Sequence, residues 1–294
     1  MSYVSRMAEA YTHALTLPLN PDSKYILLSD CHRGDGRAND NFLKNEFLYL
    51  AALRYYDRLG YTYLELGDGD ELWENRSMEK IKEMHPHSFE VLAKYRKENR
   101  AYFIYGNHDM VKKDADFCRK YPGSCDCEKT LCRQPLLQNM RFYPGILLED
   151  SLHRMNIFLT HGHQAEIMNS TLWKINRFLV RYLWKNLELF GVPDPTSAAK
   201  NNTRKEMTEN RLASWAAENN VILITGHTHR PMAGSKEVPY FNTGSCVHPA
   251  GITGIEIEHR CITLVKWSLG TNSDQVVYVK REVLGAKVCI DDVI

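Results

Sequence analysis

Five short polar clusters, each placed directly after a run of apolar residues, constrain this chain more than any other feature. The runs are short and rich in Ile, Leu, Tyr, Phe and Val, which is typical of β-strands; they are 24–29, 61–66, 101–105, 155–160 and 221–225. The clusters that follow them are Asp30-Cys31-His32, Gly67-Asp68, Gly106-Asn107-His108-Asp109, His161-Gly162-His163 and Gly226-His227-Thr228-His229. Because ligands bind at the carboxyl ends of strands in open α/β sheets, we expect the clusters to converge on one site.

The pattern between the clusters predicts an α/β fold. Apolar residues at helical spacing cover 41–59 and 77–99, and each segment lies between two predicted strands. This order predicts a parallel sheet with helices on its faces. Residues 1–21 predict a short helix and a linker. Beyond Pro239, strand-like runs separated by turns predict antiparallel pairing; these runs are 240–242, 254–258, 261–266 and 275–282.

We expect residues 1–294 to form a single domain with two insertions, at about 110–150 and 164–220. The first insertion contains a cysteine-rich loop with Cys118, Cys125, Cys127 and Cys132. Four thiolates so close together could form a tetrahedral zinc site. The alternative is a loop without metal, because the spacing matches no common zinc signature. Free thiols that behave as small hydrophobes are expected at the scattered cysteines, which are Cys31, Cys246, Cys261 and Cys289.

The second insertion, residues 164–220, predicts two helices interrupted near Gly191. Cations recur beside the apolar positions of the first helix; they are Lys174, Arg177, Arg181 and Lys185. One interpretation is a pair of helices packed on the sheet with a solvated charged face. The other is a lid over the site, with cations that bind phosphate and aromatic residues that line an apolar groove; these are Trp173, Phe178 and Trp184.

Charge and hydropathy limit the classes of partner. The formal net charge is +1, from 37 basic and 36 acidic residues, so no overall field favours nucleic acid or an anionic membrane. No run approaches the roughly 18 apolar residues of a membrane span, and the N-terminus lacks an uninterrupted apolar signal segment. We therefore expect a cytoplasmic protein. Peripheral membrane contact through the helical insertion stays open, as does the oligomeric state.

The residue types in the clusters predict a centre of two divalent metal ions. Two ions about 3.5 to 4 Å apart can bind a bridging hydroxide and stabilise the charge that develops on phosphate oxygens. Such a site needs one bridging carboxylate, and Asp68 is the natural candidate because it follows a glycine at a strand end. Histidine, aspartate and asparagine ligands suit Mn, Fe, Zn or Co better than Mg or Ca, although ligand type alone does not choose among the four. We expect manganese first.

Together and in this order, the five clusters resemble the calcineurin-like metallophosphoesterases over residues 25–246. The resemblance implies two stacked β-sheets flanked by helices. It implies one metal held by Asp30, His32, Asp68 and His229, and a second held by Asp68, Asn107, His161 and His227. The run from Gly67 to Trp73 and the basic insertion are partly similar to the UDP-2,3-diacylglucosamine pyrophosphatase branch.

The resemblance also implies that His108 is a general acid and not a ligand. A carboxylate partner orients an imidazole and supports its protonated form, and Glu71 occupies the partner position of related sites. The alternative is that His108 only supports the geometry. Arg33 and Arg230 flank the clusters and could bind substrate phosphate through two hydrogen bonds, or serve as ion-pair partners.

The expected function is hydrolysis of a phosphomonoester, phosphodiester or pyrophosphate bond in a small substrate, with nucleotide- and lipid-linked molecules among the options. The expected mechanism is attack of a metal-bridging hydroxide, with proton donation by His108. Two alternatives stay open. One is a phosphoprotein phosphatase or nuclease that uses the same centre. The other is a binding module that retains the site as structure.

Overall fold

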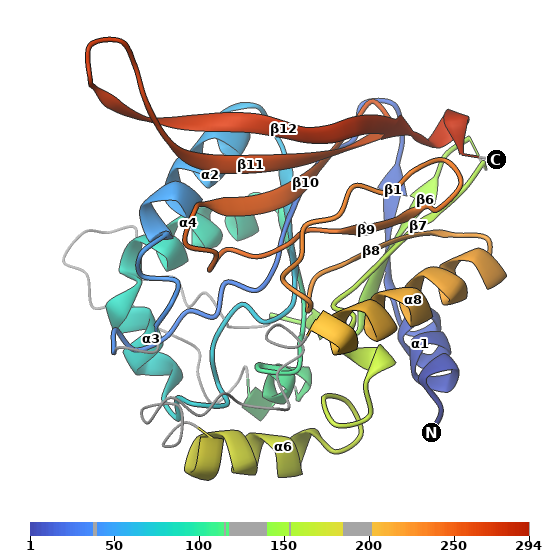
Figure 1. Cartoon of the computed structure of the whole chain (residues 1–294), viewed down its shortest axis with the longest axis horizontal. Coiled ribbons are helices and arrows are strands. Elements are labelled where there is room, and N and C mark those ends of the chain that lie inside the picture. Colours follow the sequence, from blue (N-terminus) through green and yellow to red (C-terminus); the bar gives the residue numbers. More distant parts are fainter. Residues whose placement is uncertain (38–39, 115, 118–139, 153, 185–201, 294) are drawn as a thin grey trace.

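Two β-sheets lie face to face and helices cover their outer faces (Figure 1). The computed structural model describes residues 1–37, 40–114, 116–117, 140–152, 154–184 and 202–293. The predicted fold class, an α/β arrangement of two sheets flanked by helices, is confirmed.

The larger sheet has seven strands in the order β12-β11-β10-β2-β3-β4-β5. Its parallel half comprises β2 (Lys24–Leu28), β3 (Thr62–Leu66), β4 (Ala101–Ile104) and β5 (Phe142–Tyr143). Its antiparallel half comprises β10 (Ile252–Glu258), β11 (Cys261–Thr271) and β12 (Val277–Cys289). Both halves agree with the pairing predicted for them.

The smaller sheet has five strands in the order β1-β6-β7-β8-β9. They are β1 (Leu15–Leu19), β6 (Gly145–Asp150), β7 (Ile157–Thr160), β8 (Ile222–Thr225) and β9 (Tyr240–Asn242). Two predictions were wrong here. The expected linker contains β1, because an edge strand tolerates Pro18. The antiparallel pairing expected for β9 fails, because β9 runs parallel to β8.

Helices cover the outer face of each sheet (Figure 1). On the larger sheet lie α2 (Glu46–Arg58), α3 (Met78–Met84) and α4 (Pro86–Lys97); on the smaller lie α1 (Tyr3–Thr12) and α8 (Asn202–Glu218). Segment 77–99, expected as one helix, is two helices because Pro86 disfavours helical backbone at His85. The shorter helical elements are η1 (Met110–Lys113), η2 (His163–Ala165), α6 (Trp173–Leu179), η3 (Val180–Trp184) and η5 (Ile290–Asp292).

An apolar core between the two sheets fixes their relative position. Leucine and isoleucine side chains from both sheets are buried there, including Leu27, Leu66, Ile224 and Ile255. Burial of each contributes roughly 1.5 to 3 kcal/mol to the free energy of unfolding. Because this core holds the sheets together, the carboxyl ends of β2, β3, β4, β7 and β8 are held in a fixed arrangement.

A buried histidine joins the loop after β2 to the helices. His85 lies with Nε2 2.9 Å from an Asp40 carboxylate oxygen and Nδ1 3.0 Å from a Glu46 carboxylate oxygen. Burial alone lowers the pKa of His85, but the two carboxylates outweigh it and raise the pKa to about 9. The imidazolium therefore holds the two acidic side chains together at neutral pH.

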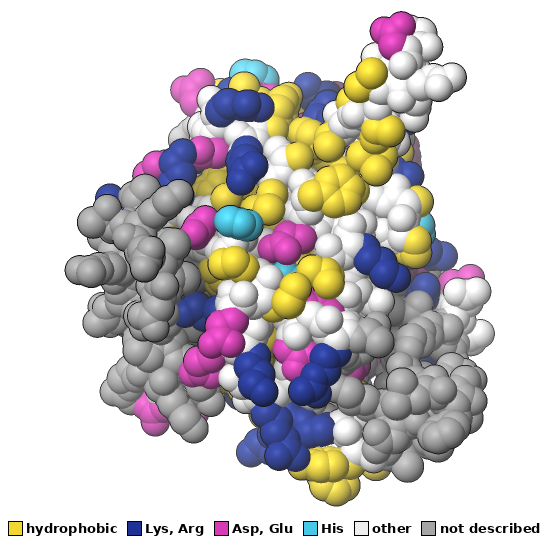
Figure 2. Space-filling model, turned by 90° about the vertical axis from the view of Figure 1, so that its left-hand side faces the viewer, with side chains coloured by type: hydrophobic (Ala, Val, Ile, Leu, Met, Phe, Trp, Pro, Cys, Tyr) yellow, Lys and Arg dark blue, Asp and Glu magenta, His cyan; other side chains and the backbone are white. Residues whose placement is uncertain are grey.

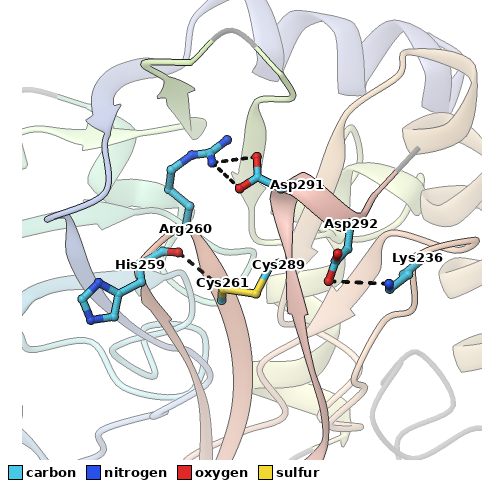
Figure 3. The surroundings of a disulfide bond; sticks show 7 residues. All are labelled: Lys236, His259, Arg260, Cys261, Cys289, Asp291 and Asp292. Atoms are coloured by element: carbon cyan, nitrogen blue, oxygen red, sulfur yellow. Dashed lines mark hydrogen bonds and ion pairs between the residues drawn. A yellow bond between two sulfur atoms is a disulfide. The ribbon is translucent and has the colours of Figure 1, made fainter.

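A disulfide closes the hairpin formed by β11 and β12 (Figure 3). Cys261 begins β11 and Cys289 ends β12, and the two residues are opposite each other in the strand register. Beside them, Arg260 forms ion pairs with Asp150 and Asp291. The disulfide joins the two strands of the hairpin, and the ion pair of Arg260 with Asp150 of β6 links the base of the hairpin to the smaller sheet.

The prediction that Cys261 and Cys289 are free thiols was therefore wrong, because their pairing depends on a strand register that spacing along the chain does not reveal. Cys31 and Cys246 are buried free thiols, as expected. Disulfides persist mainly in oxidising compartments, so the cysteines no longer favour the predicted cytoplasmic location.

The two predicted insertions are only partly described. The cysteines Cys118, Cys125, Cys127 and Cys132 lie outside the described residues, so the zinc site stays a prediction. The second insertion is largely helical where it is described, and residues 185–201 lie outside the description. Among the described residues, no helix has the length and apolarity needed to cross a membrane.

Candidate metal centre

The predicted ligands stand where strands end, and most of them have an unusual backbone. Five have positive φ angles between 47° and 69°; they are Asp30, His32, Asp68, His227 and His229. Left-handed backbone costs a non-glycine residue roughly 1 to 2 kcal/mol and is concentrated at functional sites. The fold therefore holds these five side chains in directions that an ordinary strand ending would not provide.

The first group of side chains contains Asp30, His32 and His229, whose ligand atoms all lie within 4.8 Å of one another. His32 Nε2 lies 3.3 Å from His229 Nε2, and His229 Nε2 lies 3.0 Å from Asp30 Oδ1. His32 Nδ1 donates to Glu71, so Nε2 is the nitrogen left to bind a metal ion, and it faces the other ligand atoms. Asp30 Oδ1 is buried, and no hydrogen bond of good geometry reaches it from the described residues, although His229 Nε2 lies 3.0 Å away. A cation fits this convergence of lone pairs.

The second group contains Asp68, His161 and His227, with Asn107 beside them. His161 Nε2 lies 3.1 Å from Asp68 Oδ2 and 3.1 Å from Asn107 Oδ1. His161 Nδ1 donates to the Leu66 carbonyl at 2.8 Å, so Nε2 is the nitrogen left to bind a metal ion. Burial lowers the pKa of His161, but the Asp68 carboxylate outweighs it and raises the pKa to about 9. This donor set also fits a divalent ion.

Asp68 lies between the two groups. Its Oδ2 is 3.1 Å from His161 Nε2 in the second group and 3.8 Å from His32 Nε2 in the first. Burial alone raises the pKa of Asp68, but the charges of His161 and His108 outweigh it and hold the pKa well below its usual value. The Asp68 carboxylate is thus ionised and within reach of both groups, as a bridging ligand requires.

Glu71 binds a predicted ligand and the predicted general acid with one carboxylate. Glu71 Oε2 lies 2.9 Å from His32 Nδ1 and 2.7 Å from His108 Nδ1. Burial alone lowers the pKa of His108, but the negative charges of Glu71 and Asp68 raise it to about 10. The indole of Trp73 stacks on the His108 ring with 4.3 Å between centroids. Glu71 and Trp73 together fix the orientation of the His108 imidazolium.

Sequence reasoning missed a second carboxylate, Glu166. Its Oε1 lies 3.3 Å from His227 Nε2 and accepts from Thr208 of α8 at 2.9 Å. Asn169 donates to Glu166 Oε2 at 2.6 Å, and Asn176 of α6 donates to Asn169 at 2.8 Å. A carboxylate on the far nitrogen of a ligand histidine fixes its tautomer and orientation. This buried chain of contacts links His227 to the helical insertion, and no pattern in the sequence pairs these residues.

Arg33 does not fit the predicted contact with substrate. Its side chain is buried, with Nε 2.7 Å from Asp70 Oδ1 and Nη1 2.9 Å from Glu65 Oε2. Lys112 joins the same network through Asp70 and Asp109. Removing one partner from a buried ion pair is strongly destabilising, so Arg33 stabilises the loop after β3 through its buried ion pairs.

Arg230 forms an ion pair with Glu209 of α8 and remains partly exposed. Glu209 also accepts a hydrogen bond from Thr228, in the cluster that contains His227 and His229. Arg230 therefore anchors that cluster to α8, and a substrate contact for it stays a prediction.

The helical insertion packs against the wall of the site. Trp173 and Val180 contact Trp73 and Met110 in one buried apolar cluster. Arg181 donates to the Trp73 carbonyl at 2.6 Å. Trp173 is thus a packing residue, whereas Phe178 is 61% exposed. The side chain of Trp184, the third predicted aromatic residue of the groove, lies outside the described part of the chain.

The family model described as calcineurin-like phosphoesterase matches residues 23–231, which include all five clusters. The chain belongs to the calcineurin-like phosphoesterase family. No curated protein matches it. Among solved structures, Vps29 from Chaetomium thermophilum is similar, with 11% identity, a TM-score of 0.40, and coverage of 92% of this chain and 98% of that chain.

Membership of the calcineurin-like phosphoesterases supports a metal-dependent hydrolase acting on phosphoesters. Among the described residues, the groups formed around Asp30 and around Asp68 are able to hold the divalent ions that the family implies. Neither the family nor these groups distinguish among manganese, iron, zinc and cobalt.

Proposed function

We propose that this calcineurin-like phosphoesterase hydrolyses a phosphomonoester, phosphodiester or pyrophosphate bond of a small substrate, with two divalent ions held around Asp68. The observation that best supports this proposal is that seven predicted ligands from five strand ends lie together. A histidine bound to a carboxylate lies beside them. Manganese is the first metal to test, followed by iron, zinc and cobalt.

Each ligand has a defined place in this proposal. Asp30, His32 and His229 hold one ion, and Asp68 contributes to both. The second ion is held by Asn107, His161 and His227. When bound, two ions polarise phosphoryl oxygens and lower the pKa of bound water.

His108 acts as the general acid. Its Nδ1 is occupied by Glu71, and no hydrogen bond from its Nε2 is found among the described residues, so Nε2 carries the transferable proton. The proton moves from Nε2 to the leaving oxygen of the ester, and Glu71 stabilises the charged ring beforehand. Glu71 acts through His108 and is a positioning residue.

The helical insertion serves as the cover for an apolar part of the substrate. Ile175 of α6 and Tyr182 of η3 are 56% and 49% exposed, and basic side chains lie beside them. This combination supports a small substrate with both an anionic and an apolar part, including nucleotide- and lipid-linked phosphates. It also supports peripheral contact of this segment with a membrane surface.

A panel of substrates tests the proposed reaction. Purified protein loaded with manganese is assayed with an aryl phosphomonoester, an aryl phosphodiester and a nucleotide pyrophosphate. We expect turnover of at least one of them. Phosphopeptides and single-stranded nucleic acid in the same panel test the alternative substrates. Absence of turnover on every ester would leave a binding module as the better description.

A single substitution tests the acid. His108→Ala removes the proton donor, so hydrolysis of esters with poor leaving groups slows by roughly 10² to 10⁴, and esters with good leaving groups slow much less. His87→Ala is the matched control, because the side chain of His87 is 67% exposed on α4. Equal slowing of both ester types by His108→Ala would show that His108 does not donate the proton.

A further inference from the structure

The strand β12 is an open edge. It is the terminal strand of the seven-stranded sheet, and among the described strands it pairs only with β11. Figure 1 shows it along one border of the molecule, with no described element beyond it. An edge strand presents N–H and C=O groups that can pair with another strand.

Apolar side chains are concentrated on this edge. Val277, Tyr278 and Val283 are 60%, 48% and 51% exposed, and Leu269 of the neighbouring β11 is 51% exposed. Figure 2 shows the hairpin projecting from the surface, with apolar side chains gathered at its base. A single exposed apolar residue is common on a protein surface. Four on one hairpin form an apolar patch, and burial of that patch against another chain would be favourable.

A register shift limits how much of the edge is regular. Leu284 pairs with Leu264 and Val288 pairs with Ile262, so residues 285–287 face a single residue of β11. Such a bulge disrupts pairing on the outer side as well. The regular part of the edge is therefore 277–284.

We propose that two copies of this chain associate by antiparallel pairing of their β12 strands about a two-fold axis at Arg281. A two-fold axis perpendicular to the sheet pairs residues whose side chains lie on the same face. One residue therefore lies opposite its own copy, and the axis passes between these two copies. With Arg281 on the axis, Lys280 of each copy lies opposite Glu282 of the other. Within each copy Lys280 Nζ already lies 2.9 Å from Glu282 Oε1, so these pairs join into one network of alternating charge. An axis at Lys280, Arg281 or Glu282 places one pair of like charges at the axis, but only the axis at Arg281 adds two pairs of opposite charge beside it. Charge complementarity therefore favours the Arg281 register.

The other pairs of this register are compatible with association. Val279 lies opposite Val283, and Tyr278 lies opposite Leu284, which covers exposed apolar surface on both faces. The two Arg281 side chains approach each other at the axis.

Each Arg281 guanidinium is already bound by Glu256 of its own copy, with Nε 2.6 Å from Glu256 Oε1, so its charge is compensated. Main-chain hydrogen bonds between the two edges supply the affinity, as in other cases of strand addition.

Charge reversal tests the register directly. Sedimentation of the full chain over a concentration series gives the dissociation constant of the dimer. Lys280→Glu and Glu282→Lys each replace two attractive contacts by two repulsive ones, so each raises the dissociation constant roughly tenfold or more. The double variant K280E/E282K restores the complementary pairs and returns the constant to within about threefold of the original. Circular dichroism confirms that each variant is folded.

Lys287→Glu is the matched control, because it makes the same change in net charge outside the regular edge. It leaves the dissociation constant unchanged. A chain that stays monomeric over the whole concentration series overturns the proposal and leaves the edge to a strand of another protein. A double variant no better than the single ones also overturns it, as does a Lys287→Glu effect equal to that of Lys280→Glu.

Discussion

Glu71→Gln separates the charge of the Glu71 side chain from its shape. The carboxylate accepts hydrogen bonds from His32 and His108 at 2.9 Å and 2.7 Å. Glutamine has nearly the same volume but only one oxygen, and its amide nitrogen donates. Both imidazole contacts go to Oε2, so a glutamine oxygen in that place can still accept from both rings, but neither hydrogen bond is then charge-assisted.

The magnitude follows from these two contacts. A hydrogen bond to a charged group contributes roughly 1.5 to 3 kcal/mol, against about 1 kcal/mol for a neutral one. The loss at His108 lowers its pKa from about 10, because Glu71 is the largest influence raising it. We expect kcat for poor leaving groups to fall roughly 100-fold. The loss at His32 weakens metal affinity by roughly 10- to 100-fold.

The assay measures kcat against leaving-group pKa at saturating manganese, so that reduced metal binding does not contribute. Glu71→Gln should show a steeper dependence on the leaving group than the wild type, and the greater manganese requirement appears in a separate titration. Glu83→Gln is the control, because Glu83 is an exposed residue of α3. A Glu71→Gln enzyme with the dependence and manganese requirement of the wild type would refute the role given to Glu71.

Three further predictions concern residues outside the ligand set. His85 contributes about 3 kcal/mol of stability, because its pKa of about 9 exceeds the usual value of 6.5. This contribution is full below pH 6.5 and is lost as the pH rises through 9, so denaturant unfolding should show a decline there that His85→Gln lacks. Glu166→Gln should weaken manganese binding roughly tenfold, measured by titration, without changing the leaving-group dependence. Reduction of the disulfide between Cys261 and Cys289, which are 28 residues apart, should lower the free energy of unfolding by roughly 3 kcal/mol; an unchanged value would contradict the loop-entropy argument.

The sequence predicted the parts of the fold that depend on local pattern. Short apolar runs before polar clusters identified β2, β3, β4, β7 and β8, because each run has the length and composition of a buried strand. Strand β1 was not predicted because it contains Pro18. Proline is excluded from central strands but is tolerated in edge strands such as β1. The break at His85 follows from Pro86, and apolar periodicity alone does not show it.

The site was predicted less completely than the strands. Its proposed ligands are marked by residue type and position after a strand, so their convergence could be anticipated. Glu166 carries no such mark, because its contact with His227 depends on how the insertion packs. Arg33 adjoins a cluster in the sequence, which suggested a contact with substrate, yet its side chain points into a buried ion-pair network, in line with the alternative of an ion-pair partner.

The most direct test of the two-metal centre is to count the metal ions held by the protein. Purified chain is equilibrated with manganese, freed of unbound metal and analysed by mass spectrometry for metal per chain, together with Asp68→Asn. Because Asp68 is shared, we predict two ions per chain in the wild type, fewer in Asp68→Asn, and loss of nearly all its activity. One ion or none in the wild type, or two ions and full activity in Asp68→Asn, would contradict the two-metal centre.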